Sequence, residues 1–489
     1  MKSLFCCIVA LSLSACSSGT TSPPSEQAAA QEIAITSKSP EAIDHFKKGR
    51  TLLENVRNSE AADEFKQALA LDPDFVSARA YLGVATPGAE GLKELEQANS
   101  SASALPETER LFVEGSLASR RGELDKSTSL YTELTQKASG DWRAFATLGQ
   151  QLAVQQKHAE AIQALRKATT LNPKAGTAIN SLGYESLRQG DVNGAIEAFQ
   201  QYVALEPNEP NPQDSYGEAL LGAGRFDEAA AAFEKAATLS PKFWNGWEGK
   251  AYTKYFAGDW AGGDEALGKA RASASRPSDR NAIDEVAGFA ALARGNAADA
   301  LKRFDAAAQE SGVTPSEVAR MHLDRAFVYT ETARYPDALS QLSAALTLAD
   351  SGKLPPSAAT NIRHLALAGR TTVEAKTGQV AAAQKSVEAL QKEAASRSDN
   401  PLVQSSLHMA MGMLSVAQKD LAGAAAHFKQ CTAQDSYCHW QHVLVADKGT
   451  DKAAAQAVRD ELLRVNLRDP IFLYVRSKAA PKTAPRLTN

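Results

Sequence analysis

The sequence is poor in the groups that carry reactivity. Only 5 of its 489 residues are cysteines, and none lies between Cys16 and Cys431, which excludes a disulfide-rich scaffold. The 53 basic and 57 acidic side chains leave a formal net charge of −4, so no basic excess exists to neutralise a phosphate backbone, and we expect no nucleic-acid partner. Alanine is abundant while runs of isoleucine, valine and threonine are scarce, which favours helices over strands.

Short catalytic motifs are missing as well. The sequence has no Gly-x-x-x-x-Gly-Lys-Ser/Thr phosphate loop, no His-Glu-x-x-His zinc motif and no Gly-x-Ser-x-Gly nucleophile turn. It also has no Cys-x-x-Cys-His for haem attachment. We therefore expect a protein that is not an enzyme and that needs no cofactor.

The first residues have the pattern of a targeting signal. A positive start is followed by the apolar stretch Leu4 to Leu13, which is shorter than the roughly 20 residues that a membrane-spanning helix needs. Leu13-Ser14-Ala15-Cys16 then resembles the lipobox of bacterial lipoproteins. The resemblance implies a signal peptide over residues 1–15 and acylation of Cys16, for example by palmitate, which anchors the chain to a membrane. The alternative is a plain secretory signal with a chance cysteine.

The resemblance also implies where the chain goes. Ser17 stands where an aspartate often retains such lipoproteins in the inner membrane, so we expect the outer membrane, on its periplasmic side. Residues 16–40 are rich in Ser, Thr, Pro, Ala and Gln, and they are predicted to form a flexible tether.

A repeat of 34 residues follows. Pro173, Pro207 and Pro241 each end an apolar-periodic segment, and small and large residues precede them at constant offsets. Each unit has a first-helix glycine, a second-helix alanine and a large apolar residue one turn later: Gly149, Ala161 and Leu165; Gly183, Ala195 and Phe199; Gly217, Ala229 and Phe233. Small residues allow two helices to cross closely, the large residue fills the space beside the crossing, and proline ends the second helix.

This pattern resembles the tetratricopeptide repeat family. The resemblance implies an all-α, right-handed superhelical solenoid of antiparallel helical hairpins, in which each hairpin buries its apolar face against its neighbours. We expect about eleven hairpins, with well-formed repeats over residues 41–275, degenerate repeats over 276–470 and a polar tail over 471–489.

In that family the first helix of each hairpin lines the inner face of the superhelix. Side chains there that the packing pattern leaves free suit a protein segment held by hydrogen bonds and flat aromatic contacts, although they also suit an ordinary solvated helix face. The candidate groove-binding residues are Asn180, Tyr184, Arg188, Asp214, Glu218, Asn245, Glu248, Tyr252 and Tyr255.

The two C-terminal cysteines have three interpretations. Cys431 and Cys438 are separated by six residues, and in an oxidising compartment they are predicted to form a disulfide across a helical turn. With His427 and His442 they would instead offer four ligands to a soft divalent metal. The third interpretation is two inert thiols.

The predicted function is that of a membrane-anchored envelope scaffold or adaptor that binds segments of other envelope proteins in its concave groove. The alternative is a glycan- or peptidoglycan-binding module, because four tryptophans gather in the middle repeats: Trp142, Trp244, Trp247 and Trp260. Rings open to the groove would favour sugar stacking, and rings wedged between helices would favour packing. We expect packing.

Overall fold

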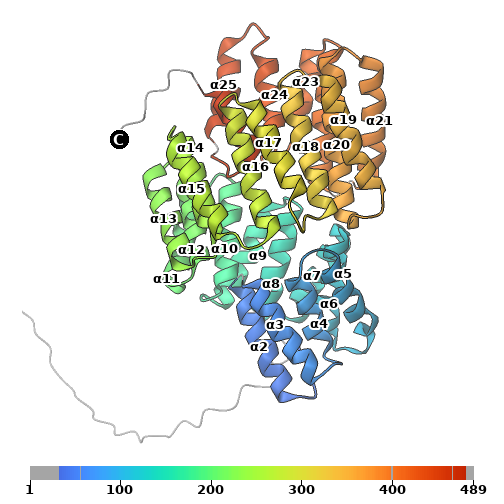
Figure 1. Cartoon of the computed structure of the whole chain (residues 1–489). Coiled ribbons are helices and arrows are strands. Elements are labelled where there is room, and N and C mark those ends of the chain that lie inside the picture. Colours follow the sequence, from blue (N-terminus) through green and yellow to red (C-terminus); the bar gives the residue numbers. More distant parts are fainter. Residues whose placement is uncertain (1–31, 56, 398–399, 465, 481–489) are drawn as a thin grey trace, which may run out of the picture.

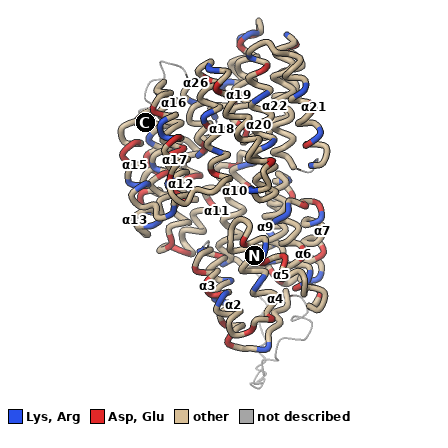
Figure 2. The backbone as a smooth tube through the Cα atoms, turned by 45° about the vertical axis from the view of Figure 1, so that its right-hand side comes forward, with Lys and Arg blue, Asp and Glu red and all other residues tan. Residues whose placement is uncertain are grey.

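The computed structural model describes residues 32–55, 57–397, 400–464 and 466–480. Within these ranges the ordered structure is helical, and no strand is formed. Both signs of charge are scattered along the whole tube (Figure 2). None of the helices in the described ranges is both long enough and apolar enough to cross a membrane.

The helices α2 to α25 pair consecutively into twelve antiparallel hairpins, one more than predicted, and the pairs stack along a superhelical path (Figure 1). The first helices are α2 (Pro40–Glu54), α4 (Val76–Ala85), α6 (Glu107–Arg121), α8 (Trp142–Val154), α10 (Gly176–Arg188), α12 (Pro210–Gly222), α14 (Trp244–Phe256), α16 (Pro277–Ala293), α18 (Pro315–Glu331), α20 (Pro356–Lys376), α22 (Pro401–Ala417) and α24 (Ser436–Ala446). The second helices are α3 (Asn58–Leu71), α5 (Gly88–Ser100), α7 (Leu124–Lys137), α9 (His158–Leu171), α11 (Val192–Leu205), α13 (Phe226–Leu239), α15 (Trp260–Ser273), α17 (Ala297–Gln309), α19 (Tyr335–Asp350), α21 (Val380–Ala395), α23 (Leu421–Phe428) and α25 (Lys452–Arg464). A 3₁₀ turn, η1 (Ala102–Ala104), follows α5.

The two helices of a hairpin cross closely for the reason that the repeat pattern predicts, because a glycine on the first helix leaves space for a ring on the second. A Cβ atom added at Gly183 would lie 2.5 Å from Phe199, and one added at Gly217 would lie 2.8 Å from Phe233. Ala195 and Ala229 are fully buried on the second helices. The same relation recurs in the degenerate half, where a Cβ at Gly288 would meet Phe304 at 2.4 Å. The structure therefore confirms that the small and large residues of the repeat pattern pack the two helices of a hairpin against each other.

Residues just before the first helix are held more tightly than a tether. The backbone N–H of Ile33 donates to Asp141, 3.2 Å away, and that of Thr36 donates to Glu109 at 2.7 Å. The Ser37 hydroxyl donates to Asp72. The described end of the predicted tether, residues 32–39, is thus an extended strap that crosses the first four hairpins, and the prediction of a flexible tether up to residue 40 is wrong there.

The C-terminal segment is also not a polar tail. Residues Pro470–Ala479 form α26, which starts with a proline in its first turn and with Asp469 as its N-cap. The helix lies on α16, α24, α25 and α14, where Phe472, Leu473 and Val475 are buried. Pro470 therefore begins a helix rather than closing the last hairpin. This helix folds back onto the stack of first helices and fills part of the inside of the superhelix.

Candidate functional site

The inner surface of the first five hairpins forms an open cleft with a volume of about 730 Å³. Its walls come mainly from the first helices α2, α4, α6, α8 and α10. The N-terminal ends of α20 and α22, from a later turn of the superhelix, lie across it and contribute Ser357, Asn361, Asn400 and Leu402.

Apolar and polar groups are mixed in this open cleft. Val84, Val154 and Leu402 are 37%, 57% and 48% exposed, and all three line it. Gln150 and Asn180 add amide groups, and the buried Oδ1 of Asn180 has no hydrogen-bond partner among the described residues. Exposed apolar side chains on a concave surface, next to an unsatisfied amide oxygen, are typical of a surface that binds another molecule.

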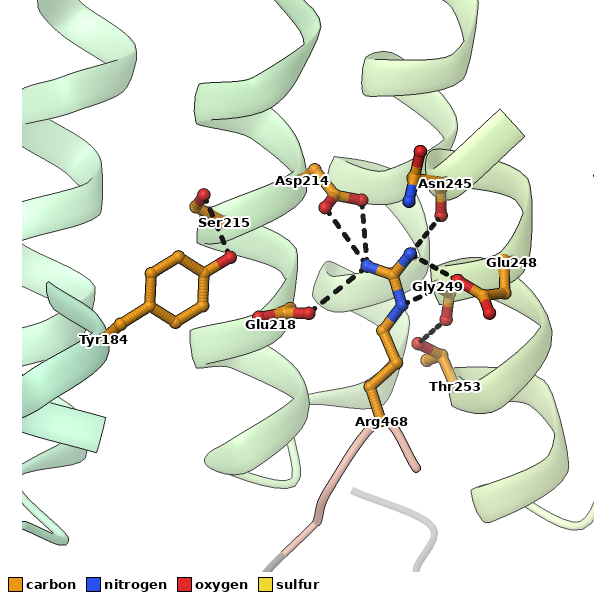
Figure 3. A network of polar contacts seen from close by, with 9 residues as sticks. All are labelled: Tyr184, Asp214, Ser215, Glu218, Asn245, Glu248, Gly249, Thr253 and Arg468. Carbon is orange, nitrogen blue, oxygen red and sulfur yellow. Dashed lines mark hydrogen bonds and ion pairs between the residues drawn. The ribbon is translucent and has the colours of Figure 1, made fainter. Parts of the chain in front are cut away.

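The inner surface of the next hairpins is occupied by the chain itself. Arg468, just before α26, extends its guanidinium between α12 and α14 (Figure 3). Its Nη1 lies 3.1 Å from both oxygens of Asp214 and 3.3 Å from Glu218. Its Nη2 lies 2.6 Å from Glu248 and donates to the carbonyl of Asn245 at 2.8 Å. We call this the arginine pocket.

Acidic groups outnumber basic ones around the arginine pocket. Burial raises the pKa of Asp214 and of Glu218, although Arg468 opposes it in both. Farther along, Glu285 pairs with Arg320 at 2.7 Å, yet burial raises the pKa of Glu285 to about 7. Burial likewise raises the pKa of Asp469 to about 6. Buried carboxylates keep ordinary pKa values only when cations compensate them. The raised pKa values therefore indicate that Arg320 and Arg468 only partly compensate the carboxylates of this region.

The structure brings six of the nine candidate groove residues to these two places. Asn180 lines the open cleft, Asp214, Glu218, Asn245 and Glu248 surround Arg468, and Tyr252 borders the same pocket. Beside the arginine pocket, the hydroxyl of Tyr184 donates to Ser215 at 3.2 Å (Figure 3). Arg188 is exposed and pairs with Glu185 on its own helix.

Tyr252 and Tyr255 are both buried packing residues. Tyr255 is buried, its hydroxyl donates to Asp264 on α15, and its ring lies where Gly263 leaves space. Tyr252 is buried at the floor of the arginine pocket, below the C-terminal segment. The prediction that both are free on the groove is wrong, because a close second helix covers one and the chain end covers the other.

Sequence reasoning missed Arg468. The signal was an arginine at the end of the last assumed repeat, directly before Asp469 and Pro470. Those two residues have the helix-start pattern of an N-cap and a first-turn proline, which would have pointed to α26. Nothing local pairs Arg468 with Asp214, which lies 254 residues earlier.

The C-terminal cysteines lie in the last part of the stack. A disulfide joins Cys431, after α23, to Cys438 in the first turn of α24. Asp435 lies close to both sulfurs, but His427 and His442 do not join them in a ligand set. Instead His427 lies beside His408, with 3.3 Å between their Nδ1 atoms. The four residues of the metal interpretation are thus not gathered at one point.

The tryptophans pack against the helices. Trp244, Trp247 and Trp260 lie partly buried on the core of α11 to α16, and Lys269 lies over the ring of Trp247. Trp142 borders the open cleft but is buried, with Arg143 over its ring. These positions favour packing over sugar stacking. Cys16 lies outside the described residues.

Comparison with known families identifies the repeat. The tetratricopeptide repeat model matches residues 46–85, 112–176 and 180–243. These matches cover about a third of the chain, and together with the stacked helical hairpins they assign its repeats to the tetratricopeptide repeat family. This is a family of protein-interaction scaffolds that is generally not enzymatic.

Solved structures with similar folds have low sequence identity. Cut9, in the Cut9–Hcn1 hetero-tetramer of the APC/C, is 14% identical, with 86% of this chain and 76% of that chain covered and a TM-score of 0.42. A tetratricopeptide repeat protein of Parabacteroides merdae is 13% identical, covering 58% and 98%, with a TM-score of 0.36. YrrB, described as a repeat protein with an unusual peptide-binding site, is 20% identical, covering 37% and 91%, with a TM-score of 0.29. All three TM-scores are below 0.5. A comparison with curated proteins found no match.

Proposed function

We propose that this protein is a lipid-anchored scaffold of a bacterial envelope that holds a segment of a partner protein in its open cleft. The observation that carries the proposal is the cleft itself, which is lined by three exposed apolar side chains and an unsatisfied amide. Burying apolar area contributes about 25 cal/mol per Å², so covering Val84, Val154 and Leu402 favours association.

The anchoring part of the proposal rests on the sequence before the described residues. The lipobox-like Leu13-Ser14-Ala15-Cys16 supports acylation of Cys16 at the outer membrane. Cys16→Ala is then expected to release the protein from membranes into the soluble fraction. Membrane association that persists in this variant would contradict the anchor.

A photo-crosslinking amino acid placed in the cleft tests the binding part. At position 154 we expect a crosslinked species of defined mass in intact cells, and at Lys235, an exposed residue of the second helix α13, we expect none. Leu402→Asp in the same protein places a charge on the opposite wall and should reduce the yield. Equal crosslinking at both positions, or a yield that ignores Leu402→Asp, would rule out the cleft as the binding site.

A further inference from the structure

The arginine pocket contacts every nitrogen of one guanidinium group. Nη1 bridges Asp214 and Glu218, Nη2 reaches Glu248 and the carbonyl of Asn245, and Nε lies 3.1 Å from Glu248. The group also lies over the ring of Phe233, 5.5 Å from its centre. A planar fork fits this set of acceptors, whereas the ammonium of a lysine is a single point charge and fits fewer of them.

The pocket is not filled by Arg468 alone. A cavity of about 430 Å³ extends from it along α14, α16 and α18, lined also by Glu285, Arg320 and Asp469. One oxygen of the buried Asp324, four residues after Arg320 on α18, has no hydrogen-bond partner among the described residues. Five carboxyl groups and two arginines therefore line this cavity: Asp214, Glu218, Glu248, Glu285 and Asp469 with Arg320 and Arg468.

The segment that carries Arg468 contacts this inner surface with both charged and apolar groups. It consists of an arginine followed at once by the short helix α26, whose Phe472 and Leu473 are buried between the inner surface and the last hairpin. The hydroxyl of Tyr474 donates to Glu331 at the end of α18. It contacts the same inner surface that a partner would use, and it comes from the far end of the chain.

We propose that the arginine pocket is a binding site for an arginine of a partner protein, and that residues 466–479 are a tethered copy of that ligand. The partner presents an arginine ahead of a short apolar helix. It replaces Arg468 contact for contact, since its guanidinium meets the same acceptors. The tethered copy lowers the partner's apparent affinity because a linked segment acts at an effective concentration on the order of millimolar.

The proposal rests on the proposed function in one respect, that the inner surface binds protein segments. Different experiments can contradict the proposed function and the arginine-pocket proposal. Crosslinking at position 154 reports only on the open cleft, while exchange at the arginine pocket is measured with purified protein and needs neither the membrane anchor nor an envelope partner.

The test measures binding of a labelled synthetic peptide of residues 466–479 to the full-length protein by fluorescence polarisation. We expect at least tenfold tighter binding to Arg468→Ala than to the wild type, because the variant's tethered segment competes without its guanidinium. Arg464→Ala is the matched control, since Arg464 is exposed at the end of α25, four residues before Arg468, and it should behave as the wild type. A peptide with alanine in place of its first arginine should lose at least tenfold in affinity for Arg468→Ala.

Further variants keep the test decisive. Glu248→Gln added to Arg468→Ala should weaken peptide binding, because it removes the negative charge of the carboxylate that both Nε and Nη2 contact. If Arg468→Ala does not fold, Arg468→Lys takes its place, and the peptide should still bind it more tightly than the wild type. Equal affinity for the wild type and the Arg468 variant overturns the proposal, and so does equal binding of the peptide without that arginine.

Discussion

The first five hairpins and the next four have the same internal packing but opposite inner surfaces. Gly183 faces Phe199 in the fifth hairpin as Gly217 faces Phe233 in the sixth. Yet α2 to α10 border an open cleft, while α12 to α18 are covered by Arg468 and α26. The comparison shows that hairpin packing and groove occupancy are separate properties of this solenoid. The first repeats with each unit, and the second depends on where the end of the chain lies.

The largest expected effect is a difference in unfolding free energy between a substitution in the filled inner surface and one in the open cleft. Phe472→Ala removes a fully buried ring of α26 that packs edge-on against Phe256, so we expect a loss of about 3–5 kcal/mol in the free energy of unfolding. Val154→Ala in the open cleft should change it by less than about 0.5 kcal/mol, because Val154 is largely exposed. Urea denaturation measures both. Equal losses would mean that the packing of α26 does not stabilise the folded chain.

An effect of intermediate size tests whether hairpins of the open and the filled regions both depend on a glycine that faces a ring of the second helix. Gly183→Ala and Gly217→Ala each push a methyl group into a buried ring, and each should lose about 1–3 kcal/mol of unfolding free energy. Gly268→Ala is the control. No atom lies within 4 Å of its added Cβ, so this mid-helix exchange should stabilise by about 0.5–1 kcal/mol. If thermal denaturation shows the two buried variants unchanged, the assigned hairpin register is wrong.

The smallest expected effect, per pH unit, is a pH dependence that arises from Glu285 in the filled region. Burial raises the pKa of Glu285 from 4.5 to about 7, with Asp469 and Glu248 adding to the shift and Arg320 opposing it. The folded state therefore binds a proton that the unfolded state has released, and this contribution to stability is lost as the pH rises from 4.5 to about 7. The slope from one group stays below about 1.4 kcal/mol per pH unit.

Glu285→Gln should flatten that decline, as followed by urea denaturation across the pH range. The lowered pKa of Glu331, where Lys376 and two tyrosine hydroxyls outweigh burial, acts in the opposite direction, and its contribution is lost as the pH falls through its folded-state value. Glu285→Gln should not change the loss of stability at low pH that comes from Glu331, and this loss serves as the internal control. A decline between pH 4.5 and 7 that is as steep as in the wild type would show that Glu285 does not titrate in this range.

Much of the fold could be predicted because its signals are local. The offsets between Gly183, Ala195 and Phe199 lie within one hairpin, and they recur every 34 residues. The inner-surface position of Asp214, Glu218 and Glu248 followed from the same register. The error at residues 471–479 came from treating Pro470 as the last residue of a repeat, although proline after aspartate also begins helices.

The sequence by itself determined the helical hairpin, its close crossing and the face that points inward, because these depend on residues a few turns apart. Only the tertiary structure decided which inner surface is open. Arg468 reaches Asp214 and Glu248 across 254 and 220 residues. That meeting depends on the rotation accumulated from one hairpin to the next along the superhelix, a sum of small angles that no local pattern records.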